Sequence, residues 1–285
     1  MEQIPKKIWI YWHQGFYDAP LVIKKCLLSW QLHHRNYEVN FLDKNSVTEY
    51  IKIPSFYNLD RKDMTIQEYS NFIRLSLLRT YGGIWVDSTI YCYASLDTWL
   101  NKYLKEGIFI FRNSFQGRLT VNWFIASVPN HYIITTWLYS HEKYFRNNYL
   151  SNTHNKFGKR AKSFFGQFLN KDVKRTQIWL TFFFTKVFKV YPYFIAHYVF
   201  NQCYLRNKLF RDQWDKTIKL SSRNHDLLFI VSRGLSFDNY LKLYNENKVF
   251  MIKLSHRISL DDTPYKDFYG LINKDFKMLK NSEPI

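Results

Sequence analysis

Three side chains of different chemistry lie close together in the sequence: the amide of Asn71, the guanidinium of Arg74 and the carboxylate of Asp87. An amide hydrogen-bonds hydroxyl groups, a guanidinium pairs with carboxylates or phosphates, and a carboxylate holds hard divalent cations. These residues form a candidate ligand site, provided that the elements that carry them bring them to one place.

The segment that carries Asn71 and Arg74 has the pattern of a helix. Between residues 66 and 81, apolar side chains recur at steps of three and four residues, and Asn71 and Arg74 fall on a neighbouring stripe. The spacing predicts a helix over 66–81 that leads directly towards Asp87.

A short strand ending at Asp87 is predicted after this helix. Two glycines at 82–83 stop the helix, because glycine tolerates the left-handed conformation that closes one. The apolar run at 84–86 is too short for a helix and is typical of a buried strand. Ligands bind at the carboxyl ends of strands in open α/β sheets, which favours a site at Asp87. One structural alternative stays open, in which Asp87 caps a turn and Arg74 is a solvated helix charge.

The motif around these residues resembles that of a known enzyme family. Residues 69–74 and 81–89 are similar to the signature of glycosyltransferases with a sugar-binding DXD region, in particular the bacterial capsular-polysaccharide-synthesis branch related to glycosyltransferase family 32. Residues 4–15, 37–45 and 123–127 resemble the same branch, in the same order. The likeness extends to about residue 130 and is faint beyond it.

The resemblance implies a divalent metal ion, Mn²⁺ or Mg²⁺, on the diphosphate of a sugar nucleotide. Asp87 is expected to hold the ion with help from Thr89 or Ser88, and His256 is expected as a further metal ligand. Two positions depart from the family pattern, since Asn71 stands where Asp is usual and Thr89 stands where the fuller motif has a second Asp. One carboxylate is then left to hold the ion, together with phosphate oxygens and water.

The resemblance also implies a catalytic set of Asp87, Arg74 and Asn71. Arg74 is expected to orient Asp87 or contact phosphate, and Asn71 to bind ribose or the donor sugar. Trp12 is expected to stack on the nucleotide base, with a role as a core tryptophan as the alternative. The residues expected to bind the donor are Tyr11, Trp12, His13, Gln14, Asn71, Arg74, Ser88, Lys253, His256 and Arg257.

Composition predicts a folded protein with a basic surface. The chain has 285 residues, is 46% hydrophobic and carries a net charge of +18. Between residues 143 and 223, seventeen Lys or Arg stand against three acidic residues. Such a surface attracts polyanions, namely nucleic acid, an anionic membrane or a diphosphate substrate. Three scattered cysteines without metal-site spacing, and a start without an apolar signal core, lead us to expect a cytoplasmic location.

An aromatic segment at 178–200 raises the question of membrane contact. Ten aromatic residues lie in it, but Lys186, Lys189, Pro192 and His197 interrupt it. Because a charge at the centre of a bilayer is costly, a spanning helix is not expected. Two interpretations stay open: the segment lies in the membrane interface, or its rings complete the core and an acceptor pocket.

Strands and helices alternate through the first half of the chain, which favours an α/β fold. Strands are expected at 7–12, 37–42, 84–86, 107–111 and 120–128, and helices at 20–33, 47–51, 66–81 and 131–149. The resemblance refines this to a GT-A-like, nucleotide-sugar-binding core over 1–150. A basic, aromatic helical insertion is expected at 151–223, and a C-terminal return to the core at 224–285.

The expected function is transfer of a sugar, with retention of the anomeric configuration, from a UDP-sugar to a glycan acceptor in bacterial capsular or other surface polysaccharide synthesis. The acceptor is expected on a lipid diphosphate, and the protein as peripheral on the inner membrane face. Two other classes stay open: a nucleic-acid-binding protein that uses the basic region, and an inactive membrane scaffold, which the departures at Asn71 and Thr89 suggest. The basic residues form no recognised recognition module, so a nucleic-acid partner is not expected.

Overall fold

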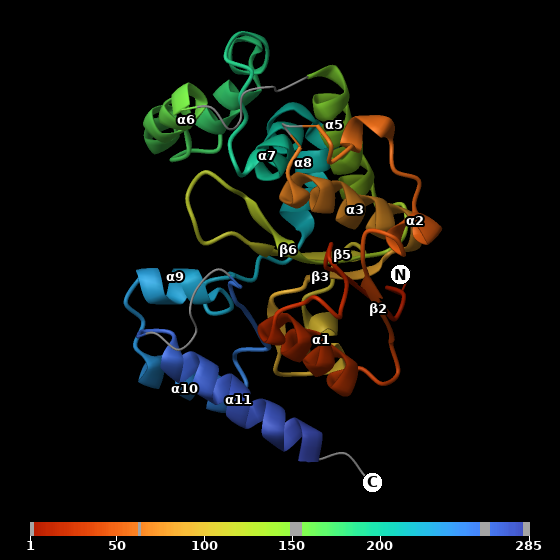
Figure 1. Cartoon of the computed structure of the whole chain (residues 1–285), viewed down its shortest axis with the longest axis vertical. Helices are drawn as coiled ribbons and strands as arrows, with labels where there is room; N and C mark the ends of the chain where they lie inside the picture. The colour runs from red at the N-terminus through yellow and green to blue at the C-terminus, as the bar shows by residue number, and fades with distance from the viewer. Residues whose placement is uncertain (1–2, 62–63, 149–155, 257–262, 282–285) are drawn as a thin grey trace.

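The computed structural model describes residues 3–61, 64–148, 156–256 and 263–281, and a mixed sheet lies at its centre (Figure 1). The strands are β1 (Lys7–Tyr11), β2 (Glu38–Leu42), β3 (Gly83–Asp87), β4 (Ile90–Cys92), β5 (Ile108–Arg112), β6 (Thr120–Ser127) and β7 (Met251–Lys253). The central sheet has the order β2-β1-β3-β6-β5, in which β1, β2 and β3 are parallel and β6 is antiparallel to both neighbours. A smaller antiparallel sheet joins β4 to β7.

Helices cover both faces of the central sheet (Figure 1). They are α1 (Leu21–His33), α2 (Val47–Tyr50), α3 (Ile66–Tyr81), α4 (Leu96–Trp99), α5 (Tyr132–Asn147), α6 (Lys156–Leu169), α7 (Ile195–Arg206), α8 (Lys208–Lys216), α9 (Leu227–Ser232), α10 (Phe237–Asn245) and α11 (Lys266–Asn281). On one face α3 packs on β1, β3 and β6, with α5, α7 and α8 behind it. On the other face α1 lies with the β4–β7 pair and α11. The predicted α/β class is confirmed.

The helix and strand around the candidate site form as their sequence predicts. Thr65 caps α3 by accepting a hydrogen bond from the backbone N–H of Glu68. The helix ends at Gly82, whose φ is 63°, and Gly83 follows with a φ of 90°. A Cβ on Gly83 would lie 2.5 Å from the backbone oxygen of Lys7. Glycine at 83 therefore lets β3 start directly against β1.

Two large hydrophobic clusters hold the layers together. The first joins the central sheet to helices on both of its faces, and includes Trp9, Trp85 and Trp137, each at most 1% exposed. The second joins α1 to β4, β7 and α11 through side chains such as Ile23 and Ile252. Full burial of one such side chain stabilises the fold by about 1.5–3 kcal/mol. The division of the chain at residues 150 and 223 stays a prediction.

The aromatic segment at 178–200 has two kinds of rings. It contains part of a 3₁₀ helix (Arg175–Leu180), a π-helical turn (Phe183–Val187) and the start of α7. Trp179 and Phe184 are buried in a small third cluster, whereas Phe182 is 73% exposed. The core interpretation therefore holds for the buried rings, whereas membrane contact of the exposed rings and an acceptor pocket stay predictions. None of the helices in the described ranges is both long and apolar enough to cross a membrane.

Candidate functional site

The carboxylate of Asp87 lies at the carboxyl end of β3, where it is paired with cations on both sides. Its Oδ1 accepts hydrogen bonds from Arg74 Nη2 at 3.0 Å and from Trp85 Nε1 at 2.9 Å. Its Oδ2 lies 3.2 Å from Lys253 Nζ. Burial alone would raise the pKa of Asp87, but Arg74 and Lys253 outweigh it and hold this pKa below its usual value. Asp87 is therefore an ionised carboxylate at neutral pH, and its side chain keeps 23% exposure.

Arg74 is buried rather than solvated, which rules out the surface-charge alternative. The residue is 4% exposed, and its Nη1 donates to the backbone oxygen of Asn122 at 2.6 Å. Its guanidinium carbon lies 5.0 Å from the centre of the Trp85 ring. Burial lowers the pKa of Arg74, while Asp87 acts in the opposite direction. Arg74 thus fixes the Asp87 carboxylate between α3 and β6, and its expected role in donor binding and catalysis stays a prediction.

Lys253 reaches this place because the C-terminal part of the chain returns to it. In the β4–β7 pair, Lys253 is the partner of Ile90, three residues after Asp87. Its ammonium group hydrogen-bonds the hydroxyl of Thr89, and the neighbouring backbone N–H of Leu254 donates to the Thr89 carbonyl at 2.8 Å. One ammonium group therefore contacts both motif positions, 87 and 89.

Asn71 belongs to a buried polar network behind Arg74. Its Nδ2 donates to Glu68 Oε2 at 3.0 Å, and its Oδ1 accepts from Asn122 Nδ2 at 2.8 Å. His141 Nε2 lies 3.3 Å from the same oxygen of Glu68, and its Nδ1 is hydrogen-bonded to Tyr57 at 2.6 Å. The Asn71 amide thus links α3 to β6. A direct contact between Asn71 and a donor stays a prediction.

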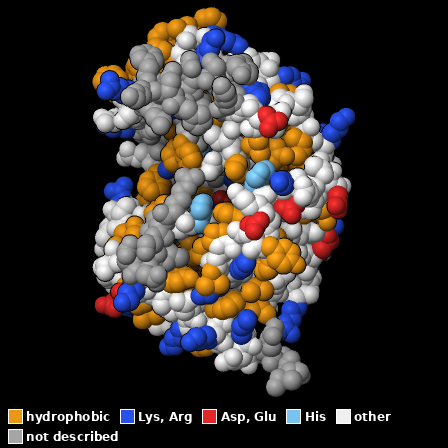
Figure 2. All heavy atoms as spheres, viewed as in Figure 1, with side chains coloured by type: hydrophobic (Ala, Val, Ile, Leu, Met, Phe, Trp, Pro, Cys, Tyr) orange, Lys and Arg blue, Asp and Glu red, His pale blue; other side chains and the backbone are white. Residues whose placement is uncertain are grey.

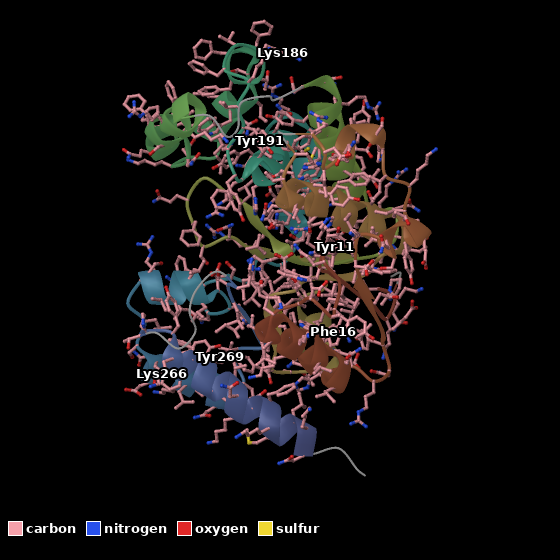
Figure 3. All side chains as sticks on the ribbon, viewed as in Figure 1. Tyr11, Phe16, Lys186, Tyr191, Lys266 and Tyr269 are labelled. Carbon is pink, nitrogen blue, oxygen red and sulfur yellow. The ribbon has the colours of Figure 1, made fainter. Side chains whose placement is uncertain are left out.

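The carboxyl end of β1 lies beside Asp87, since Tyr11 is its partner in the parallel β1–β3 ladder. The Tyr11 hydroxyl and His13 Nδ1 are hydrogen-bonded at 2.7 Å, and burial lowers the pKa of His13. β2 and β3 lie on opposite sides of β1, so this edge is the switch point of the sheet. Ligands of open α/β sheets bind in the crevice at such a point. Figure 3 shows Tyr11 near the middle of the molecule.

Trp12 and His256 contact each other at the same edge. Their ring centres are 5.3 Å apart in an edge-to-face arrangement, and Trp12 also packs against the second hydrophobic cluster. The indole N–H of Trp12 is buried without a hydrogen-bond partner among the described residues. Trp12 is therefore partly a core residue, and its expected stacking on a nucleotide base stays a prediction.

The positions of Gln14, Ser88 and Arg257 do not show what these residues bind. Gln14 is exposed in the turn after β1, and Ser88 is 9% exposed directly beside Asp87. Arg257 lies outside the described residues. The predicted contacts of Gln14, Ser88 and Arg257 with a donor stay predictions.

Trp85 and Asn122 are parts of the site whose contacts were not predicted. Trp85 stands two residues before Asp87 in β3, so the two side chains point to the same face of the sheet. This alternation of side chains along a strand is the pattern from which the contact of Trp85 with Asp87 could have been predicted. Asn122 lies on β6, whose antiparallel pairing with β3 places Phe124 opposite Val86. The pairing register of β3 and β6 cannot be predicted from the local spacing of residues.

Asp87 offers a divalent metal ion one carboxylate, which two cations already contact. The described residues contain no cluster of three or more His, Cys, Asp or Glu side chains with the spacing of a metal site. Asp87 lies between Arg74 and Lys253, and these three groups carry a net charge of +1. The carboxylates of Glu68 and Asp226 act on the same two cations from further away. Unit charges about 4 Å apart interact by roughly 4 kcal/mol at an effective dielectric constant of about 20. Repulsion from two cations thus offsets the attraction of one carboxylate, and the expected Mn²⁺ or Mg²⁺ stays a prediction.

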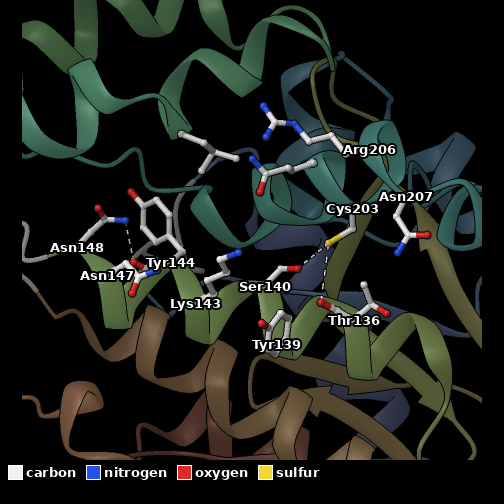
Figure 4. Close-up of a pocket in the computed structure, with 12 residues that line it drawn as sticks. Thr136, Tyr139, Ser140, Lys143, Tyr144, Asn147, Asn148, Cys203, Arg206 and Asn207 are labelled. Atoms are coloured by element: carbon white, nitrogen blue, oxygen red, sulfur yellow. Dashed lines mark hydrogen bonds between the residues drawn. The ribbon is translucent and has the colours of Figure 1, made fainter.

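A cavity of about 440 Å³ lies between α5 and α7, away from Asp87 (Figure 4). Lys143 and Arg206 line it, together with Ser140 and Cys203, whose Oγ and Sγ atoms are 3.3 Å apart. It contains none of the residues that the sequence analysis identified as a candidate site.

A smaller cavity of about 350 Å³ is basic and aromatic. Arg118, Lys171 and Arg233 line it, and no acidic side chain occurs among its described lining residues. The guanidinium of Arg118 lies 3.9 Å from the centre of the Phe194 ring. These groups suit an anionic ligand that also has an apolar part.

Comparisons with known proteins point to one family. The model of the capsular polysaccharide synthesis protein family matches residues 1–155. An O-glycosyltransferase of Annulohypoxylon truncatum is 25% identical over 152 residues, which are 47% of this chain and 36% of that protein. An uncharacterised glycosyltransferase of Acanthamoeba polyphaga mimivirus is 25% identical over 131 residues, which are 45% of this chain and 51% of that protein. The chain thus spans about a third of one curated relative and about half of the other.

Among solved structures, the PaToxG glycosyltransferase is similar with a TM-score of 0.36 and 17% identity. The match covers 62% of this chain and 74% of that chain.

Proposed function

Because the chain belongs to the capsular polysaccharide synthesis protein family, we propose that it is a glycosyltransferase with a nucleotide-sugar donor and a GT-A-like core. The observation that carries the proposal is the ion-paired carboxylate of Asp87 at the switch point between β1 and β3. Nucleotides bind in this crevice in sheets of this kind. Lys253 supplies positive charge there, and the diphosphate of a sugar nucleotide is the group that needs it.

We take a UDP-sugar as the donor and retention of the anomeric configuration as the outcome, as the family resemblance implies. The leaving group of the transfer is a nucleoside diphosphate, on which negative charge grows as its bond to the sugar breaks. Cations that the fold holds in place before the reaction stabilise such charge effectively.

The acceptor is proposed to be a glycan on a lipid diphosphate that binds in the smaller cavity. Arg118, Lys171 and Arg233 match two phosphates in charge, and the rings of Phe115 and Phe194 offer apolar surface to the adjoining lipid. A cavity that carries both kinds of group suits an amphipathic anion better than a free sugar.

The protein is proposed to sit on the inner membrane face through the region around α6. Phe164, Phe168 and Phe182 are 75%, 57% and 73% exposed, and Lys186 lies near them in an exposed position. Figure 3 shows Lys186 at the top of the molecule, and orange and blue side chains adjoin at the same end in Figure 2. Exposed rings flanked by cations are typical of proteins that bind at the interface of an anionic membrane.

A thermal-shift screen tests the proposed function. We expect at least one nucleotide sugar from a panel of UDP-, GDP- and CMP-sugars to raise the melting temperature, because a ligand of the folded state stabilises it. The screen is run with EDTA and again with Mn²⁺. No shift with any nucleotide sugar under either condition contradicts the proposal. Salt-sensitive binding of nucleic acid that ignores Asp87→Asn would instead support the nucleic-acid alternative. Vesicle binding without turnover would support the scaffold.

A further inference from the structure

The ammonium group of Lys253 lies between two positions of the motif, where the resemblance implies a metal ion. It lies 3.2 Å from Asp87 Oδ2 and also hydrogen-bonds the hydroxyl of Thr89. These are the first and last positions of the motif. The other carboxylate oxygen of Asp87 is already engaged by Arg74 and Trp85.

We propose that Lys253 takes the place of the divalent metal ion, so that the ammonium group binds the donor diphosphate and transfer proceeds without a metal. This inference rests on the proposed glycosyltransferase function. It also gives the departure at position 89 a chemical reason. Threonine offers the ammonium group a hydroxyl oxygen, whereas a second carboxylate would neutralise the positive charge that the diphosphate needs.

The fold holds Lys253 in place before a ligand arrives. The backbone N–H of Lys253 donates to the His225 oxygen at 2.7 Å, and β7 pairs with β4 directly after the motif. The Lys253 side chain keeps 23% exposure, so its end reaches solvent. An ammonium group has three N–H donors. Asp87 and Thr89 accept two of them, which leaves one for a phosphate oxygen.

Charge supports the same assignment. Lys253 and Arg74 both contact Asp87, so a divalent cation at this carboxylate would meet two positive charges, whereas a phosphate at Lys253 would meet an opposite charge. The ion pair with Asp87 fixes the ammonium group in one direction, so it needs no rearrangement when charge develops on the leaving group.

The transfer balances without a metal. The bond between the anomeric carbon and the diphosphate oxygen breaks, and its electron pair stays on the nucleoside diphosphate beside Lys253. The acceptor hydroxyl oxygen forms the new bond to the anomeric carbon, and its proton passes to the departing diphosphate. The products are the extended glycan and the nucleoside diphosphate.

Binding of UDP and GDP, measured by calorimetry after removal of metals with EDTA, tests the inference. Wild-type protein is expected to bind one of them in EDTA, with an affinity that Mn²⁺ changes less than about threefold. Lys253→Met, which keeps the length of the side chain without its charge, is expected to weaken binding about ten- to hundredfold. Lys253→Arg keeps the charge and is expected to retain part of the affinity.

Lys248→Met is the matched control. Lys248 lies on the exposed turn before β7 and pairs with Glu246 at 2.7 Å, so its loss removes the same charge away from the site. We expect unchanged binding in this variant. Melting curves show whether each variant is folded, and the Mn²⁺ dependence of binding by wild-type protein remains decisive if Lys253→Met is unstable.

Two results overturn the inference in different ways. Binding or hydrolysis of the donor that needs Mn²⁺ in wild-type protein, or a Lys253→Met variant that binds as well as wild type in EDTA, refutes the metal substitution and leaves the glycosyltransferase proposal intact. Absence of nucleotide binding and of turnover with every donor, both in EDTA and in Mn²⁺, refutes the proposed function and the inference with it.

Discussion

The guanidinium of Arg74 is hydrogen-bonded at both of its terminal nitrogens. One nitrogen bonds Asp87 on β3, the other bonds the backbone oxygen of Asn122 on β6, and the planar group lies over Trp85. Lysine cannot reproduce this geometry, since its ammonium group is a point charge without a planar fork. Arg74 therefore acts as a positioning residue for the carboxylate.

We expect Arg74→Lys to lower the free energy of unfolding by about 1–3 kcal/mol, because one buried acceptor loses its donor. Urea denaturation at neutral pH measures this difference. Arg79→Lys in the last turn of the same helix is the control, since Arg79 is exposed, and its effect is expected within about 0.5 kcal/mol. Equal effects in the two variants would contradict the account of Arg74.

Among the elements, the turn between α3 and β3 is the most constrained near the site. Gly82 and Gly83 both have positive φ, and a Cβ at either position would meet backbone atoms at 2.8 Å or less. The turn sets where β3 begins, and so where Asp87 emerges at the far end of the strand. The two glycines of the turn thus help to determine where the Asp87 carboxylate lies.

Gly83→Ala is expected to destabilise the protein by at least about 2 kcal/mol, because both φ and the contact with Lys7 oppose a side chain. Gly270→Ala is the matched control: Gly270 lies exposed in α11, and a Cβ there would meet no atom within 4 Å. That substitution is expected to be neutral or to stabilise by up to about 1 kcal/mol. Thermal and urea unfolding compare the two. A Gly83→Ala variant as stable as Gly270→Ala would show that the turn is not restrictive.

His34 follows α1 and connects this helix to the start of α4 through two hydrogen bonds. Its Nδ1 lies 2.9 Å from the Trp30 oxygen, and its Nε2 accepts from the Leu96 N–H at 2.9 Å. Burial is the main cause that lowers the pKa of His34 to about 4. The unfolded chain, with an ordinary histidine pKa near 6.5, therefore binds more protons between pH 6.5 and pH 4, and the contribution of His34 to stability falls as the pH falls through this window.

Urea unfolding at about pH 7.5 and pH 5 tests the contribution of His34 to stability. We expect wild type to lose about 2 kcal/mol more than His34→Gln between the two pH values, because glutamine does not titrate. The comparison removes the effect of other titrating groups, which both proteins share. An equal pH dependence in the two proteins would contradict the proposed contribution of His34.

Helices and strands that depend on a local residue pattern were predicted correctly from the sequence. The helix over 66–81 and the strand that ends at Asp87 are found as expected, because periodicity and the glycine pair determine both. The contact of Lys253 with position 89 was not predicted from local pattern, since it depends on pairing between β4 and β7, which are separated in the sequence by β5, β6 and most of the helices. The burial of Arg74 was also not readable, because it arises from β6 packing over the helix.

At the scale of the whole molecule, the surface around α6 is distinct. Phe182 and Phe183 are exposed in an otherwise basic region, while Trp179 and Phe184 of the same segment are buried. Composition predicted the basic and aromatic character, but only the packing separates rings that serve the core from rings that face solvent. The exposed set is what a membrane interface can use.

We expect the protein to bind vesicles that contain anionic phosphatidylglycerol, with binding that weakens as salt is raised. Phe182→Ser combined with Phe183→Ser is expected to weaken binding at least about fivefold, because two rings no longer enter the interface. Tyr17→Ser is the control, since Tyr17 is 92% exposed and next to Phe16, which lies in the lower half of Figure 3, far from Lys186. Sedimentation with vesicles measures binding. Equal binding of all three proteins would contradict this surface as the membrane contact.

The most direct test of the account is the rate at which purified protein releases nucleoside diphosphate from its preferred nucleotide sugar, compared between wild type and Asp87→Asn. Asparagine keeps the shape of the side chain and removes the charge that holds Arg74 and Lys253. We predict a loss on the order of a hundredfold in a variant that melting curves show to be folded. A folded Asp87→Asn variant that releases the diphosphate at the wild-type rate would contradict the central role of this carboxylate.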